Sequence, residues 1–535
     1  MSSDPLPVRP DLDQLRRQAK ELRDAAQSGD PAARRRIAAH GPVRARVTLS
    51  AAQLAVAREH GFASWARLKE EVEARQAALA QRVEEFLVAS IRDWTNRPAR
   101  MLARDPEIAG YDFRTAVVLG DAARVRDLLD RDPTLAVRPD ERTGWTALHA
   151  VCASQWNRID TARAAGMTEV ARLLLDAGAE PGATAPPPGR PGGRRWSPLF
   201  CAVAGAPNPA ITRLLLERGA RPDDDHMVYL AAFGDDHETL RLLLPYSSSA
   251  AATAALAAPI STNDADGVRI LLAGGARPDQ PLPGDLFGES HENKPPVPPL
   301  YYAVQADCDA RLVEMLLAGG ADPDAAGWDG RTPYQLAVRG ARDDMAGLLA
   351  RYGARDEATS TDRFIGACLR GDEAAARRLL DADPDLPARL GDDDHLALIQ
   401  AAELGRTEAV RLMLDFGFPV GARATDGDGE TVLHAAAGSG STAAVELLLA
   451  RGADIEARDT TWSSTPLEWA IVGSGMRLGR NPAPDWPGTV RTLIEAGAST
   501  ADIVLSPDDD KPPSPEVAAL LSDYGIPGQG PGGTA

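Results

Sequence analysis

The residues that could do chemistry are few and stand apart from one another in this sequence. Two of the eight histidines follow runs of aspartate: His226 after residues 223–225 and His395 after residues 392–394. Such a composition could bind a metal ion. However, consecutive residues of one turn point in different directions, and no His-x-x-x-His or His-Glu-x-x-His spacing occurs. We therefore predict solvated turns at both positions and no metal site.

Nucleophilic chemistry also lacks a candidate. The sequence has no Gly-x-Ser-x-Gly segment, no Walker loop and no Gly-x-Gly-x-x-Gly segment after a strand pattern. No Cys-x-x-Cys pair occurs, and four widely separated cysteines fit buried, reduced thiols of a cytoplasmic protein: Cys152, Cys201, Cys308 and Cys368. We predict no catalytic residue and no cofactor, and we expect that the protein is not an enzyme.

One phrase recurs along the chain and indicates the elements that position these residues. Each copy has a leucine doublet, typical of the buried stripe of a helix, followed by a glycine that allows the chain to leave the helix. The copies are LLLDAGAEP (173–181), LLLERGARPD (214–223), ILLAGGARPD (270–279), MLLAGGADPD (315–324), LLARYGARD (348–356), LLLARGADIEARD (447–459) and the weaker RTLIEAGAS (491–499).

A second, shorter helix precedes several of these phrases. Its openings place a threonine at the expected N-cap, and proline follows in two of them because proline is tolerated at the first helical position. The residues of this repeated motif are Thr146, His149, Thr332, Pro333, Thr431, His434, Thr465 and Pro466.

This pattern resembles the ankyrin repeat, and residues 426–459 match that repeat nearly throughout. The resemblance extends over about residues 111–525, as eleven full or degenerate repeats and a terminal stub at Pro515–Tyr524. It implies an all-α repeat solenoid of helix–turn–helix units with β-turn fingers. It also implies that the imidazoles of His149 and His434 bridge backbone groups of neighbouring repeats rather than act in catalysis.

The array looks duplicated, because Phe113, Gly120 and Asp121 have counterparts 251 residues later in the sequence. We predict sub-arrays at 111–357 and 362–525, a helical N-terminal module at 1–100 and a disordered Gly/Pro tail at 526–535. The polar segment 356–362 between the sub-arrays could be a hinge or a seam.

The resemblance also predicts which residues meet a partner, because the variable positions of each finger lie at its tip. These positions hold Arg142, Thr143, Trp145, Arg194, Trp196, Trp328, Asp329, Arg331, Asp428, Glu430, Trp462 and Ser464. Trp and Arg dominate interface hot spots, although each indole could instead pack on a neighbouring finger. Some fingers depart from the family pattern: Glu141, Gly327 and Thr460 replace the leading aspartate, and Arg195 and Ser463 replace the glycine.

The first hundred residues are predicted to form a small helical module. Leu12, Leu15, Ala19 and Leu22 have helical spacing, residues 50–53 look like a capping box, and a long helix should run from about Ser64 toward Trp94. The segment 53–65 is similar to one often seen ahead of bacterial ankyrin arrays. The module also contains the best basic patch in the chain, made of Arg34, Arg35, Arg36, Arg44 and Arg46.

Charge separates two functional hypotheses. The net charge of −19 argues against a general nucleic-acid binder, although residues 1–100 hold 18 basic and 13 acidic side chains against 40 and 64 in the remainder. We favour a monomeric, cytoplasmic, non-catalytic scaffold for a protein partner that has a basic patch, with no membrane span. The alternative is a regulator that docks nucleic acid, or a nucleic-acid-associated protein, through the basic module. The excess of Arg (54) over Lys (4) is typical of a GC-rich bacterial genome.

Overall fold

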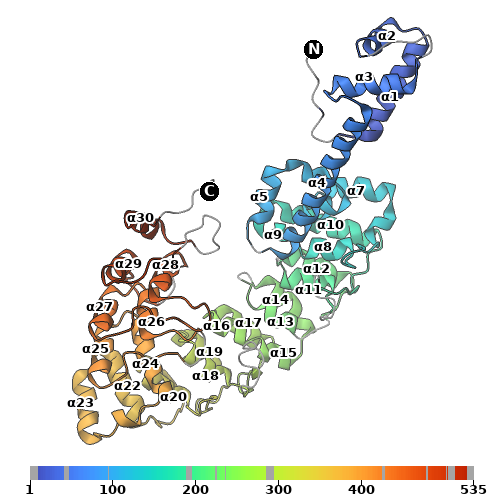
Figure 1. Ribbon diagram of the computed structural model, residues 1–535. Helices are drawn as coiled ribbons and strands as arrows, with labels where there is room; N and C mark the ends of the chain where they lie inside the picture. The colour runs from blue at the N-terminus through green and yellow to red at the C-terminus, as the bar shows by residue number, and fades with distance from the viewer. Residues whose placement is uncertain are drawn as a thin grey trace. The chain divides into compact units, whose positions relative to one another are not determined.

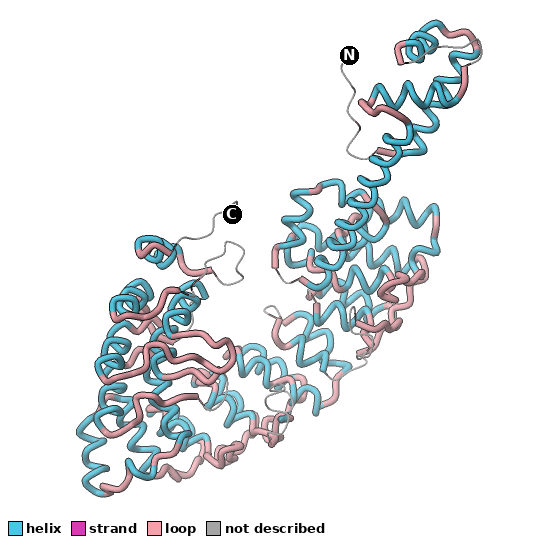
Figure 2. The backbone as a smooth tube through the Cα atoms, viewed as in Figure 1, coloured by secondary structure: helices cyan, strands magenta, loops and turns pink. Residues whose placement is uncertain are grey.

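The described part of the chain consists of helices joined by turns and loops. The computed structural model describes residues 6, 10–40, 47–93, 95–187, 195–205, 207–222, 226–234, 237–284, 295–424, 428–476, 480–501, 503 and 512–526. Within these ranges no strand is present, and Figure 2 shows only helices and loops. Isolated backbone bridges join Ala185 to Trp196, Leu282 to Val297 and Arg423 to Thr431. The fold is an all-α repeat solenoid, and the chain divides into two compact units, Met1–Ala258 and Pro259–Ala535.

The N-terminal module of the first unit closes around its own small core. Its elements are α1 (Leu12–Gln27), α2 (Pro31–Ala38), α3 (Leu49–Glu59), the long α4 (Trp65–Arg92) and α5 (Arg97–Arg104) (Figure 1). The buried stripe of α1, which includes Leu15, Ala19 and Leu22, packs against α3 and the start of α4. The predicted capping box at 50–53 is wrong, because the Thr48 hydroxyl accepts the N–H of Ala51 and α3 begins at Leu49.

Helix α4 belongs to two cores. Leu68 and Val72 at its start are buried in the module, whereas Phe86 and Ser90 near its end pack on the repeats. The indole of Trp156 lies 6.0 Å from the Phe86 ring, centroid to centroid, and its N–H donates to the Ser90 hydroxyl at 3.0 Å. A single helix therefore connects the module to the array. It ends at Arg92, close to its predicted end, and Trp94 lies outside the described residues.

The repeats of the first unit are pairs of antiparallel helices. These helices are α6 (Phe113–Val118), α7 (Ala122–Arg131), α8 (Ala147–Cys152), α9 (Trp156–Ile159), α10 (Ala164–Asp176), α11 (Pro198–Ala204), α12 (Pro209–Glu217), α13 (His226–Ala231), α14 (Glu238–Leu243) and α15 (Ser249–Ala254). Short 3-10 turns cover Pro106–Gly110, Pro133–Ala136, Thr161–Arg163 and Leu244–Tyr246. First helices such as α6, α8 and α11 pack on one another, and second helices such as α7, α10 and α12 do the same.

The second unit continues this arrangement. Helix α16 (Ala257–Ser261) spans the division between the units. It is followed by α17 (Ala265–Ala273), α18 (Pro299–Gln305), α19 (Ala310–Ala318), α20 (Pro333–Arg339), α21 (Asp343–Arg351), α22 (Ser360–Arg370), α23 (Glu373–Ala382), α24 (Asp392–Glu403), α25 (Thr407–Asp415), α26 (Val432–Gly438), α27 (Thr442–Ala450), α28 (Pro466–Met476), α29 (Trp486–Glu495) and α30 (Pro515–Asp523) (Figure 1).

The two repeats related by 251 residues have the same local structure. Asp121 caps α7 and Asp372 caps α23, in each case through a carboxylate that accepts a backbone N–H three residues later. The preceding glycines, Gly120 and Gly371, both adopt left-handed backbone angles, with φ of 70° and 72°. Equivalent caps at equivalent offsets agree with a duplication of the array.

The predicted sub-array boundary near residue 360 lies inside the second unit, where the helices are tightly stacked. A Cβ atom on Gly366 of α22 would lie 2.2 Å from the Val338 carbonyl oxygen of α20, so only glycine fits this approach. Arg339 of α20 also reaches across the boundary to Asp362 (3.7 Å) and to Asp394 of α24 (2.8 Å). This packing favours a seam over a hinge, and the domain limits themselves stay a prediction.

Candidate functional site

The histidines of the repeated motif join one repeat to the next. His434 Nδ1 accepts the backbone N–H of Thr431 at 3.2 Å, which places the ring proton on Nε2. That Nε2 lies 3.0 Å from the carbonyl oxygen of Ser464, in the following finger. His149 repeats this geometry with the Thr146 hydroxyl at 2.9 Å and the Trp196 carbonyl oxygen at 3.2 Å.

Both imidazoles are kept neutral by their surroundings. Burial lowers the pKa of His149 to about 4 and lowers the pKa of His434 as well. Both nitrogens of each neutral ring are engaged by the backbone and a threonine, so neither is open to a substrate. The motif histidines therefore act as structural bridges between repeats.

The remaining motif residues open helices. The Thr332 hydroxyl accepts the Gln335 N–H (3.3 Å), and α20 begins at Pro333. The Thr465 N–H donates to the Glu468 carboxylate at 2.6 Å, and α28 begins at Pro466.

The finger at residues 140–145 is organised by Asp140. Its Oδ1 accepts the N–H groups of Arg142 (3.1 Å) and Thr143 (2.9 Å). Burial acts to raise the pKa of Asp140, but these N–H groups and the Thr143 hydroxyl outweigh it and hold the pKa below its usual range. The carboxylate that organises this finger therefore belongs to Asp140, one residue before Glu141 at the family's leading position.

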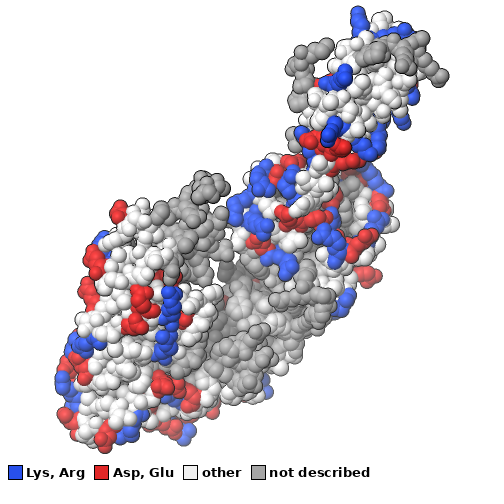
Figure 3. Space-filling view, viewed as in Figure 1, with Lys and Arg blue, Asp and Glu red and all other residues white. Residues whose placement is uncertain are grey.

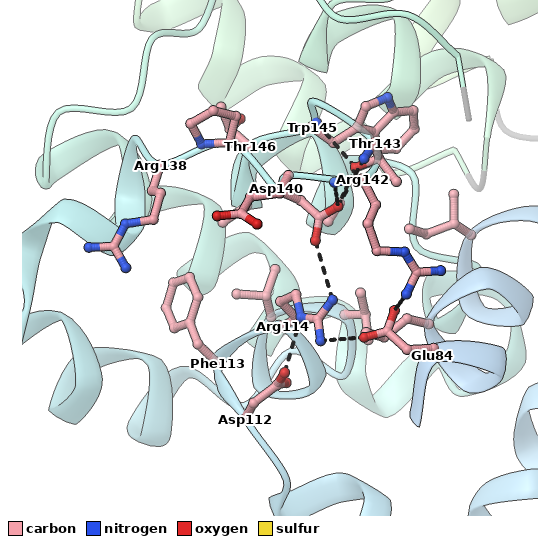
Figure 4. A pocket seen from close by; sticks show the side chains of 18 of the residues that line it. Glu84, Asp112, Phe113, Arg114, Arg138, Asp140, Arg142, Thr143, Trp145 and Thr146 are labelled. Carbon is pink, nitrogen blue, oxygen red and sulfur yellow. Dashed lines mark hydrogen bonds and ion pairs between the residues drawn. The ribbon is translucent and has the colours of Figure 1, made fainter. Parts of the chain in front are cut away.

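Arg114 of α6 ties this finger to the N-terminal module (Figure 4). Its guanidinium donates to Glu84 of α4 (2.6 Å), Asp112 (3.0 Å) and Asp140 (3.2 Å). Burial alone would lower the pKa of Arg114, but the bonds to Glu84 and Asp112 more than offset it and raise the pKa. The tip residue Arg142 pairs with the second oxygen of the same Glu84 carboxylate. Arg142 and Thr143 are thus held in place before any partner arrives.

The tryptophans of the first two fingers lie within the repeat stack. Trp145 is only 3% exposed, and its indole N–H donates to the Pro186 carbonyl oxygen at 2.8 Å. Its ring centroid lies 6.2 Å from that of Trp196, which is half-buried and lies 5.2 Å from the Phe200 ring. These two indoles follow the alternative considered from the sequence, packing on neighbouring fingers. Arg194 lies outside the described residues.

The finger near residue 330 is also stabilised by contacts within the chain. Trp328 is half-buried, with its ring edge-on to Tyr301 at 5.9 Å between centroids. Arg331 pairs with Asp329 at 2.9 Å and with Asp394 at 3.5 Å. The charged tip residues Asp329 and Arg331 therefore satisfy each other.

The finger at residues 459–464 presents its tryptophan to solvent. Trp462 is 66% exposed, the largest exposed fraction among the exposed large hydrophobic side chains of the described residues. Asp459, one residue before Thr460, accepts the N–H groups of Trp462 (2.6 Å) and Ser464 (3.1 Å) and so fixes this finger. Ser463, at the glycine position, has a left-handed φ of 56°, and Gly144 (72°) and Gly330 (76°) are also left-handed.

Asp428 and Glu430 lie in the finger next to Trp462. The Thr460 N–H and hydroxyl both donate to the Asp428 carbonyl oxygen, at 2.8 and 2.9 Å. These two hydrogen bonds connect the neighbouring fingers. Burial and the nearby Glu430 carboxylate raise the pKa of Glu403 on α24. The Arg480 guanidinium acts on the pKa of Glu403 in the opposite direction, but its effect is smaller.

Sequence reasoning missed Glu84, Asp112 and Arg114 because nothing local marks them. Glu84 is 58 residues from Arg142, and only the tertiary contact between α4 and the first finger brings them together. Within the described ranges, no group of three or more His, Cys, Asp or Glu side chains could hold a metal ion. No helix of the described residues is long and apolar enough to cross a bilayer.

Two family models agree with the repeat architecture. A family model of ankyrin repeats in three copies matches residues 364–459, and a model of a single ankyrin repeat matches residues 143–185. Among solved structures, the chain is similar to the crystal structure of the human ASB11 ankyrin repeat domain. The two share 18% identity with a TM-score of 0.22, over 46% of this chain and 99% of that chain. No curated protein matches the chain.

Proposed function

This chain is an ankyrin repeat protein, and from that premise we propose that it is a non-catalytic scaffold that holds a protein partner against the finger tips and the adjoining first helices. Ankyrin repeats generally act as protein–protein interaction modules. An array of stacked repeats offers an extended surface rather than a deep catalytic cleft.

The observation that carries the proposal is the exposed Trp462 on a rigid finger. Asp459 accepts bonds from several N–H groups of this finger and from the Trp469 indole (2.9 Å), so the loop conformation is fixed in the free protein. A finger whose backbone is already fixed loses little conformational freedom on binding. A tryptophan buried against a partner typically contributes about 2 kcal/mol or more.

The chemistry around Trp462 favours a basic partner. Asp428 and Glu430 belong to the neighbouring finger, and Glu403 lies close enough to Glu430 to feel its charge. A lysine or arginine of the partner would meet a surface with an excess of carboxylates there. We therefore expect the partner to present cations to this pair of fingers.

The experiment compares the wild type with Trp462→Ala as bait in a lysate of the source organism, followed by mass spectrometry and titration of the captured protein. Tyr352→Ala is the matched control, because Tyr352 is an exposed aromatic at the end of α21, outside the fingers. We expect Trp462→Ala to bind the captured partner at least about tenfold more weakly, and Tyr352→Ala to bind it normally. A partner held equally by all three proteins would overturn the assignment of the interface to this finger.

The structure gives no specific support to nucleic-acid docking by the N-terminal module. Arg36 forms an ion pair with Glu59 (2.9 Å), and Arg34 donates to the Ala26 carbonyl oxygen (2.9 Å), so both stabilise the module itself. Arg44 and Arg46 lie outside the described residues. Recovery of nucleic acid in the capture experiment would reverse this choice.

A further inference from the structure

The last turns of α4 border an apolar groove on the first unit (Figure 4). Its apolar lining includes Val88 and Ile91 of α4, Phe113 of α6, and Pro139 and Trp145 at the first finger. The groove has a volume of about 560 Å³, which lies within the range of about 300–1,000 Å³ found for ligand sites. It exists only because a helix outside the repeats lies beside the array.

A second depression of about 620 Å³ adjoins the first along α4. The two share four lining residues: Glu84, Val88, Arg92 and Arg142. Either depression alone would suit a small molecule, but together they make an elongated groove that follows the helix. Its length favours a segment of polypeptide as the occupant.

The charges of the groove almost cancel one another. The lining of the two depressions contains six acidic and five basic side chains: Glu84, Glu85, Asp93, Asp112, Asp140, Glu141, Arg92, Arg97, Arg114, Arg138 and Arg142. Arg114 and Arg142 are already bonded to the inner carboxylates, and Figure 3 shows both signs of charge interspersed on the visible face of this unit. A strongly charged ligand would meet no net complementary charge, so the complementary occupant is uncharged.

The groove has an exposed apolar side chain and a rigid framework, and both favour an apolar side chain of a ligand. Val88, at the junction of the two depressions, is 47% exposed. The Glu84 carboxylate binds Arg114 with one oxygen and Arg142 with the other, which fixes α4, α6 and the finger relative to one another. Covering the exposed valine and filling a rigid groove would stabilise a complex without the entropy cost of closing a loop.

We infer that this groove binds a segment of a partner polypeptide through a bulky, uncharged side chain such as Phe, Trp, Leu or Met. The inference rests on the proposed scaffold function but concerns the first finger and α4 rather than the fingers around Trp462, with a different driving force. Binding at the acidic fingers is electrostatic and depends on salt, whereas binding in the groove depends on apolar burial and does not.

The test uses a phage-displayed library of random dodecapeptides selected against the full chain, with fluorescence anisotropy of the enriched peptides. We expect peptides with a central bulky apolar residue, and affinities that change less than about twofold between low and high salt. Val88→Arg and Val88→Glu should each weaken binding at least about tenfold, because either side chain obstructs the groove. Val137→Arg is the matched control, since Val137 is 48% exposed and does not line the groove.

Several results would overturn the inference. Peptides that tolerate both Val88 variants would place the contact elsewhere. If only one of Val88→Arg and Val88→Glu lost peptide affinity, charge and not apolar burial would decide binding. A selection that enriches nothing over a bare support would also overturn it. The selection could instead enrich basic peptides that bind the Val88 variants normally and bind Trp462→Ala weakly. That result would overturn the assignment of binding to the groove and would support the scaffold proposal. The two proposals can therefore fail separately.

Discussion

The tryptophans at the finger positions differ in exposure, and this difference decides what each can do. Trp145 is buried and hydrogen-bonded to Pro186, whereas Trp462 is largely exposed on a loop fixed by Asp459. We predict that Trp145→Ala lowers the free energy of unfolding of the first repeats by about 3–5 kcal/mol, through the lost contacts and the cavity. Trp462→Ala should change it by less than about 0.5 kcal/mol. Urea unfolding followed by circular dichroism measures both, and equal losses would contradict the assigned environments.

His149 provides a residue-scale prediction on pH. Its pKa is lowered to about 4 by burial, so between this value and about 6.5 the unfolded chain takes up a proton that the folded chain does not. The contribution of neutral His149 to the free energy of unfolding is therefore fully present above this window. It is lost as the pH falls through the window. We expect His149 alone to remove about 2 kcal/mol of unfolding free energy between pH 7 and pH 5.

The control for this pH effect is His149→Gln. An amide at this position keeps a donor near the Trp196 carbonyl oxygen but does not titrate, so the loss between the two pH values should shrink by about 2 kcal/mol. His434→Gln should likewise make the free energy of unfolding depend less on pH, because burial also lowers the pKa of His434. An unchanged slope in His149→Gln would show that the imidazole does not remain neutral in the fold.

At the scale of elements, the strongly periodic helices could be predicted and their lateral contacts could not. The leucine doublets and threonine caps predict helices such as α20 and α26, and the long N-terminal helix ends close to its expected position. The contact of Trp145 with Trp196 joins side chains that are 51 residues apart in the sequence, and no local pattern sets it. The groove beside α4 depends on a docking of α4 against α6 that sequence spacing does not encode.

That docking gives a prediction for α4. Phe86 is fully buried and contacts Trp156 of the array, whereas Val88, two residues later, is about half exposed. We expect Phe86→Ala to cost about 3–5 kcal/mol and to raise amide hydrogen exchange in α6 and in the second half of α4. Val88→Ala is the matched control and should leave exchange nearly unchanged. Normal protection of α6 in Phe86→Ala would mean that the array does not depend on this helix.

At the scale of the whole chain, charge is divided unequally between the two compact units. Residues 1–258 contain 35 basic and 33 acidic side chains, whereas residues 259–535 contain 23 and 44. The second unit includes Trp462, Asp428 and Glu430, so the acidic excess accompanies the finger pair proposed to bind a basic partner. A field of this sign accelerates the approach of cations and is screened by salt.

We therefore predict that a fluorescein-labelled arginine-rich peptide binds the full chain at low salt and loses about tenfold or more in affinity at high salt. The change should lie mainly in the association rate, because screening removes steering while leaving the contacts of the bound state intact. Photo-cross-links should map to residues 259–535, and Trp462→Ala should raise the dissociation rate instead. Cross-links confined to residues 1–258 would contradict the assignment, since that part of the chain has almost no net charge to attract the peptide.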